Sequence, residues 1–311
     1  MPILAAPPAA QPGLVIEDVG YVVATWYAPD GSVWPLMNED LGWHTLADGV
    51  AGLDAAAITI TTDKRMRGGV RVRHIRPEQR AITWPLDVYS AESHTQFVAR
   101  WRELMLAFTQ TSRLGPGWLE IARPDGTARQ AAAYYQAGFE GRHGMGVLSD
   151  QAAITLLCED PYWSDRDPVV IDRAYATGVP FLVPFPTVSS AHVLGDTTIV
   201  NPGDVEAWPT WTITGPASGL TATLHTTGEA FTLDPALTAH GPLAAGETAT
   251  IRTNPAQVRG PADAVWTGAL DWPGAVLWSL PPGEHPVTFA VAGAGPGSAV
   301  RLEFFPRYES A

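Results

Sequence analysis

Three close pairs of carboxylates are the residues in this sequence that most readily suggest catalysis. They are Glu39-Asp40, Glu159-Asp160 and Asp165 with Asp167. Glycoside hydrolases use two carboxylates that converge in space from separate parts of a chain. Closeness in sequence is therefore no evidence for such a site, and a chain with 32 acidic residues produces such pairs by chance. A hydrolase that uses dispersed carboxylates stays open as an alternative.

Other catalytic signatures give no support for an enzyme. The sequence has no G-x-S-x-G, no P-loop, no H-E-x-x-H and no EF-hand loop. The glycine-rich stretch Gly141 to Gly146 lacks the strand-to-helix context of phosphate cradles and is expected to be a loop. The eight histidines occur singly, and Cys158 lies in an apolar run that favours a buried thiol. We expect no catalytic residues, no cofactor and no metal site.

A basic island stands out in an acidic chain. Its candidate contact residues are Lys64, Arg65, Arg67, Arg71, Arg73 and Arg76. The 17 residues from Lys64 to Arg80 carry seven bases against one acid, which is +6. Val70-Arg71-Val72-Arg73 alternates, so both arginines are expected on one face of a strand. Three interpretations stay open: a solvated hairpin face, a contact between copies of the chain, and a local, weak DNA contact.

Composition excludes several classes of protein. The net charge of −13 argues against tight wrapping of nucleic acid, and a single cysteine excludes an intramolecular disulfide framework. No apolar run is long enough for a membrane span, so we expect no membrane anchor. Residues 1–13 lack the features of a secretory signal and, with four prolines, predict an extended N-terminal arm.

Glycine and proline recur about every eight to twelve residues between short runs rich in Val, Ile, Thr and Trp, which is typical of many short strands. Ile58 to Thr62 alternates Ile with Thr and predicts a half-buried strand. One segment differs: from Ser93 to Thr109 the apolar residues form a single helical stripe that includes Phe97, Trp101 and Phe108. Ser93 and Gln96 have capping-box spacing. The fold class is therefore mostly β with one long helix, at about 93–110.

The pattern of strands divides the chain. An N-terminal β domain is expected over 14–165, a connection over 166–195 and a C-terminal β-sandwich over 196–311. Val276 to Ser279 is among the strands expected in the sandwich. Three tryptophans, Trp208, Trp211 and Trp272, are candidates for an aromatic surface or for core packing. Exposed, they would suit stacking on sugars; buried, they would fill the core.

The order of residues resembles the distal tail proteins of long-tailed, non-contractile bacteriophages, in the version found in phages of actinobacteria. No single motif is diagnostic, but their order and spacing from about Leu14 to Glu309 are fairly specific. One departure is Arg252, where such proteins often carry Asp. The matching motifs are Asp30-Gly31, Arg80-x-Ile82, Phe97-x-x-x-Trp101-x-x-Leu104, Gly115-Pro116-Gly117-x-Leu119, Pro124-Asp125-Gly126-x-x-Arg129, Asp160-Pro161-Tyr162-Trp163, Asn201-x-Gly203-Asp204, Trp208-Pro209-x-Trp211, Thr214-Gly215-Pro216, Leu277-Trp278-x-Leu280-x-Pro282-Gly283 and Phe304-x-Pro306-Arg307-Tyr308.

The resemblance implies a structural role in the virion, at the tail tip, for a protein made in the host cytoplasm. It implies an N-terminal β-sheet or split-barrel domain with one helix and a galectin-like C-terminal β-sandwich. It further implies a homohexameric ring that joins the tail tube protein to the tail-associated tip or fibre protein and to receptor-binding protein. DNA would pass through the channel without stable binding. The alternative is a carbohydrate-binding β-sandwich module for attachment to the host surface.

Overall fold

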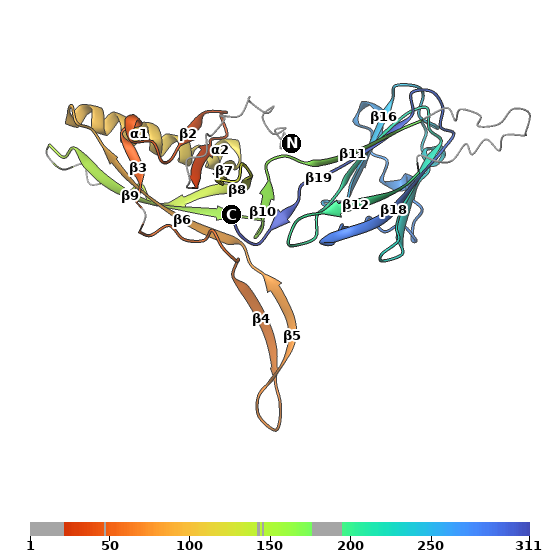
Figure 1. Cartoon of the computed structure of the whole chain (residues 1–311), viewed down its shortest axis with the longest axis horizontal. Helices are drawn as coiled ribbons and strands as arrows, with labels where there is room; N and C mark the ends of the chain where they lie inside the picture. Colours follow the sequence, from red (N-terminus) through yellow and green to blue (C-terminus); the bar gives the residue numbers. More distant parts are fainter. Residues whose placement is uncertain (1–21, 47, 142–143, 145, 176–194) are drawn as a thin grey trace, which may run out of the picture. The chain divides into compact units, whose positions relative to one another are not determined.

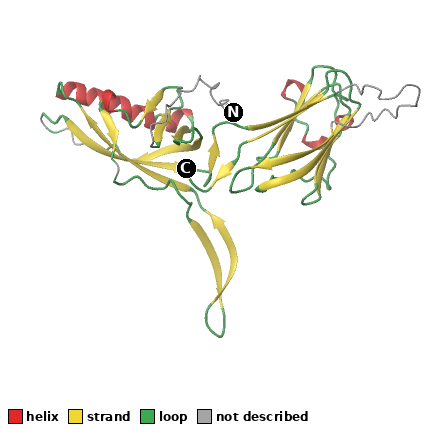
Figure 2. Cartoon of the chain, viewed as in Figure 1, coloured by secondary structure: helices red, strands yellow, loops and turns green. Residues whose placement is uncertain are grey.

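The computed structural model describes residues 22–46, 48–141, 144, 146–175 and 195–311. The described chain is mostly β and divides into two compact units (Figures 1 and 2). Unit 1 comprises residues up to Arg166 together with Tyr308–Ala311, and unit 2 comprises Asp167–Arg307. The expected arm over 1–13 lies outside the described residues.

A nine-stranded antiparallel sheet forms the body of unit 1. Its path runs β2-β1-β7-β8-β9-β6-β3, with β10 and β20 joined beside β8. The strands are β1 (Val23–Tyr27), β2 (Val33–Pro35), β3 (Trp43–Thr45), β6 (Arg80–Tyr89), β7 (Gly117–Ala122), β8 (Ala128–Ala137), β9 (Ser149–Cys158), β10 (Trp163–Asp165) and β20 (Arg307–Tyr308). A 3₁₀ turn, η1 (Glu39–Leu41), precedes β3.

Helix α1 (His94–Thr109) packs on this sheet, and the short α2 (Thr111–Leu114) follows it. The predicted stripe is confirmed, since Phe97, Trp101 and Phe108 are buried. Phe108 stacks on Trp26 of β1 with ring centroids 4.7 Å apart. Ser93 caps the helix by accepting a hydrogen bond from the backbone N–H of Gln96 at 3.2 Å. Along the described residues α1 is the single long helix.

Strands β4 (Ile58–Lys64) and β5 (Val70–Pro77) form a separate two-stranded hairpin in unit 1. Figure 1 draws it in orange, extending from the sheet. The expectation of a half-buried strand over Ile58 to Thr62 is wrong: the strand forms, but no second layer within the described part of the chain covers either face. Ile58 and Ile60 are 57% and 54% exposed.

Unit 2 is a sandwich of two antiparallel sheets, as the sequence predicts. One sheet has the order β11-β19-β13-β16-β17, and the other β12-β18-β14-β15. Short 3₁₀ turns η2 (Pro235–Leu237), η3 (Pro261–Asp263) and η4 (Thr267–Ala269) lie between strands. The strands are β11 (Val169–Ala174), β12 (Gly195–Asn201), β13 (Thr210–Thr214), β14 (Gly219–Leu224), β15 (Glu229–Leu233), β16 (Thr248–Arg252), β17 (Gln257–Arg259), β18 (Gly283–Ala292) and β19 (Ala299–Phe304).

Three details of unit 2 differ from the sequence expectations. Strand β11 lies within the segment expected as a connection, because Val169-Val170-Ile171 pairs with β19. Tyr308–Ala311 belongs with unit 1, where Tyr308 is buried. Residues 276–279 form no strand: Trp278 is buried in the core, but the backbone there forms no ladder between its flanking prolines.

Candidate functional site

The basic island of the sequence forms the outer part of the β4–β5 hairpin. Two backbone hydrogen bonds of 3.1 Å close its tip. The N–H of Gly68 donates to the carbonyl of Arg65, and the N–H of Arg65 donates to the carbonyl of Gly69. Gly68 and Gly69 have φ angles of 89° and 77°, which residues with side chains rarely adopt. This glycine pair allows the tight reversal that places the cations of both strands together.

The strand register sorts the hairpin side chains into two faces. Cross-strand partners share a face and successive residues alternate, so Ile60 opposite Ile75 defines an apolar face. Ile58, Val70 and Val72 belong to the same face, because a register shift between Thr61 and Thr62 places one extra residue in β5, between Val72 and His74. All five apolar side chains are between 49% and 57% exposed.

The opposite face of the hairpin is polar and carries arginines among threonines. Arg71 lies opposite Asp63 in the strand register, and Arg73 forms an ion pair with the Asp63 carboxylate. Arg76 pairs with Glu78 at 2.9 Å and holds the pKa of that carboxyl below its usual value.

The side chains of the other hairpin cations have no partner among the described residues. The charged groups of Lys64, Arg65, Arg67 and Arg71 form no hydrogen bond or ion pair with any residue that the structure describes. The six candidate contact residues are therefore brought together on one exposed element, and four of them are available to a partner.

Arg80, at the base of the island, has a different role. It is 2% exposed, and its guanidinium lies 5.6 Å from the centre of the Trp163 ring. Its N–H groups donate to the backbone carbonyls of Pro161, Gly52, Asp54 and Glu309. Burial lowers the pKa of Arg80, which nevertheless stays protonated in ordinary conditions. This arginine is a structural clamp, and the sequence expectations did not single it out because its acceptors are backbone groups far along the chain.

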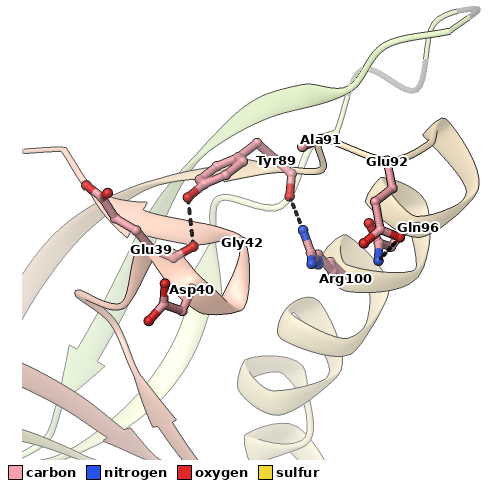
Figure 3. Close-up of a pocket in the computed structure, with 8 residues that line it drawn as sticks. All are labelled: Glu39, Asp40, Gly42, Tyr89, Ala91, Glu92, Gln96 and Arg100. Carbon is pink, nitrogen blue, oxygen red and sulfur yellow. Dashed lines mark hydrogen bonds between the residues drawn. The ribbon is translucent and has the colours of Figure 1, made fainter.

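One cavity in unit 1 lies between η1, the end of β6 and the start of α1 (Figure 3). It measures about 180 Å³, and carboxylates of Glu39, Asp40 and Glu92 line it. Its polar groups serve the fold: the Tyr89 hydroxyl donates to the carbonyl of Glu39 at 2.7 Å, and Arg100 donates to the carbonyl of Tyr89 at 2.8 Å.

A second cavity, of about 350 Å³, lies between the β1–β2 turn and α1. Trp34, Leu106 and Ala107 give it apolar walls, while Asp30 and Glu103 contribute carboxylates. Gln110 and Arg113 also line it. Leu106 is 42% exposed although it lies on the central helix. No sequence pattern indicates this cavity, because its walls come from two segments that are far apart in the chain, Asp30 to Trp34 and Glu103 to Arg113.

The other candidates for chemistry have structural roles. Asp165 accepts a hydrogen bond from the Tyr308 hydroxyl at 2.9 Å, and Asp160 accepts one from the backbone N–H of Tyr162 at 3.0 Å. Cys158 is buried, and burial raises its pKa to about 11, which is the opposite of what a nucleophilic thiolate needs. Among the described residues, no three His, Cys, Asp or Glu side chains are grouped to hold a metal ion.

The three candidate tryptophans have three different environments. Trp211 is fully buried and meets Phe289 edge to face, with ring centroids 4.9 Å apart. Trp208 is half-buried. Trp272 is 54% exposed, and its indole N–H donates to the carbonyl of Thr267 at 2.9 Å. The structure therefore does not gather them into one aromatic surface. Within the described part of the chain, no helix combines the length and apolar character needed to cross a bilayer.

Comparison with known proteins finds relatives by structure. No protein-family model matches the sequence. No curated protein matches it either. Among solved structures, the Dit protein (gp 19.1) of phage SPP1, described as a paradigm of the hub adsorption apparatus in phages that infect Gram-positive bacteria, aligns with a TM-score of 0.61 and 15% identity. The alignment covers 92% of this chain and 99% of that chain.

Two structures of the phage P2 baseplate in its activated conformation also match. The calcium form gives a TM-score of 0.53 and the strontium form 0.54. Each is 11% identical, and each alignment covers 93% of this chain and 99% of the other. At these identities the likeness establishes the fold, and it confirms at that level the resemblance seen in the sequence.

Proposed function

We propose that this chain is a structural protein of a phage tail tip, where six copies form a ring. The ring joins the tail tube protein to the tail-associated tip or fibre protein and to receptor-binding protein, and it leaves a channel for DNA. The supporting observation is the alignment of 92% of this chain with 99% of the SPP1 hub protein. Both units of the chain take part in that likeness, so it does not rest on one common β domain.

The N-terminal domain, over 14–165, is proposed as the ring-forming part, and the hairpin cations as its contact residues. The unpartnered Lys64, Arg65, Arg67 and Arg71 support this, because a cluster of free cations on an exposed element is suited to an acidic partner surface.

The acidic remainder of the chain suits a DNA channel. Six copies at −13 each would carry −78 formal charges. Like charges repel, so an acidic channel wall would keep passing DNA from binding. Arg71 and Arg73 are then expected at protein contacts, and finding them on the open channel wall would overturn that assignment.

Ring assembly can be tested with purified protein by mass photometry and negative-stain microscopy. We expect a sixfold ring that Arg71→Glu weakens. Arg252→Glu is the matched control, because Arg252 is also an exposed arginine on a strand. Equal loss of rings in both variants would show that general charge, not the hairpin, is responsible.

A carbohydrate-binding role for unit 2 is the second candidate, and the exposure of Trp272 is the observation that favours it. An exposed, hydrogen-bonded indole is a suitable platform for stacking on a sugar. Binding to a glycan array that Trp272→Ala abolishes would support this role. If the wild-type protein binds no glycan on the array, this role is excluded.

A further inference from the structure

The β4–β5 hairpin has an apolar face that none of the described residues of its own chain covers. A two-stranded hairpin is marginally stable by itself in water. Here five β-branched side chains, Ile58, Ile60, Val70, Val72 and Ile75, form a contiguous exposed stripe, which marks an interaction surface. The element therefore requires a partner to bury this face.

Charge identifies a second copy of the chain as that partner. The segment Lys64 to Arg80 carries +6, and the rest of the chain carries −19. A cationic arm on one copy and an acidic body on the next are complementary, and such a head-to-tail contact between unlike surfaces gives a ring where the rotation between copies closes.

The exposed tip of the hairpin is suited to insertion into a cavity on another surface. Met66 is 105% exposed, so the described residues of its own copy leave it uncovered, and Arg65 and Arg67 flank it. Methionine is unbranched and adaptable, and its sulfur makes favourable contacts with aromatic rings. A receiving site should offer an aromatic wall with carboxylates at its rim.

The cavity between the β1–β2 turn and α1 has these features. Trp34 and Leu106 supply apolar walls, and Asp30 and Glu103 supply the carboxylates. The wall is held in place: Asp30 accepts hydrogen bonds from the backbone N–H and the hydroxyl of Ser32, and the Trp34 indole donates to that hydroxyl at 2.8 Å. Glu103 is exposed and forms no hydrogen bond or ion pair with the described residues.

The smaller cavity in Figure 3 is a poorer match for this tip. Its lining is mostly polar, with three carboxylates and Arg100, and Ala91 is its only aliphatic side chain. At about 180 Å³ it also has half the volume of the cavity at Trp34.

We propose that the hairpin tip of one copy enters the Trp34–Leu106 cavity of a second copy, with Met66 against these two side chains and Arg65 and Arg67 facing Asp30 and Glu103. The apolar face of the hairpin is buried along the same contact. This inference rests on the proposed ring, and it names the receiving surface that the ring proposal leaves open.

A cysteine pair tests the contact directly. In assembled protein, Met66→Cys with Leu106→Cys should form disulfides between copies under mild oxidation and give a ladder on a non-reducing gel. Cys158 is buried and has a pKa of about 11, so it should form no disulfide under these conditions. Met66→Cys with Leu148→Cys is the control, because Leu148 is similarly exposed, at 44%, but lies outside the cavity.

A charge swap gives an independent readout. Arg67→Glu should lower the association constant roughly tenfold, and Glu103→Arg in the same chain should restore it. If wild-type rings assemble but the Met66–Leu106 pair links no better than the control, this inference is overturned while the ring stands. If wild-type protein forms no ring, it is the proposed function that fails.

Discussion

Arg80 and Glu309 are joined by a hydrogen bond of 2.8 Å from the guanidinium Nη2 to the backbone carbonyl, across 229 positions of sequence. The same guanidinium also holds carbonyls of Gly52 and Pro161. The segment Tyr308–Ala311, which follows unit 2 in the chain, is thereby fastened into unit 1. Arg129 adds to this by stacking on the Tyr308 ring at 3.5 Å.

Arg80→Ala should lower the free energy of unfolding of unit 1 by roughly 3 kcal/mol, because it removes a buried side chain that donates to four backbone carbonyls. Urea denaturation followed by tryptophan fluorescence measures this change. The control is Arg71→Ala, an exposed hairpin arginine, which should change the value by no more than about 0.5 kcal/mol. Equal effects would refute the clamp role of Arg80.

The stability of unit 1 should fall in alkali because of Cys158. Its thiol has a pKa of about 11 in the folded state, against 9.0 for an unperturbed thiol. Below pH 9 both states are protonated and stability is unaffected. Between pH 9 and 11 the unfolded state loses its proton first, so stability falls by about 1.4 kcal/mol per pH unit from this group. The free energies of unfolding of wild type and Cys158→Ala, measured by denaturation at pH 8 to 11, should converge as pH rises. A constant difference between the two proteins over this range would exclude a contribution from Cys158 ionisation.

The tryptophans of unit 2 should separate into core and surface types. Trp211→Ala removes a fully buried ring and should cost about 3–5 kcal/mol of stability. Trp272→Ala removes an exposed ring with one hydrogen bond and should cost less than about 1 kcal/mol. Thermal denaturation of the two variants gives the comparison, and similar losses would show that Trp272 also belongs to the core.

The apolar face of the hairpin should matter to assembly and not to the single copy. Ile60→Ser with Ile75→Ser changes two side chains that are more than half exposed. We expect the unfolding midpoint of the monomer to stay unchanged within error, while sedimentation velocity shows a loss of oligomers. The matched change on the polar face, Thr59→Ser with Thr61→Ser, should alter neither quantity. Unchanged assembly in the isoleucine variant would mean that this face stays solvated.

Local patterns in the sequence predicted local structure well. The stripe of Phe97, Trp101 and Phe108 and the cap at Ser93 depend on residues three or four apart, so helix α1 could be predicted. The capping box is half formed, because the Gln96 side chain bonds to Glu92 instead of returning to Ser93. The alternation in Ile58 to Thr62 correctly indicated a strand with one apolar face.

The sequence expectations that failed concern burial and long-range contacts, which depend on the other segments that pack against a residue. Alternation of apolar and polar residues cannot say whether another layer packs on Ile60, and no layer formed by residues that the structure describes does so. Trp278 is buried as its apolar surroundings suggest, but burial does not require a strand ladder. The clamp at Arg80 and the cavity at Trp34 were missed because each brings together residues that only the tertiary fold places side by side.

The central claim is that copies of this chain form a closed sixfold ring. Mass photometry of the purified protein, with class averages from electron microscopy of the same sample, measures the number of copies and the symmetry together. We expect particles of six copies with an open centre. A monomer at every concentration, together with the absence of such a ring from tail particles, would contradict it.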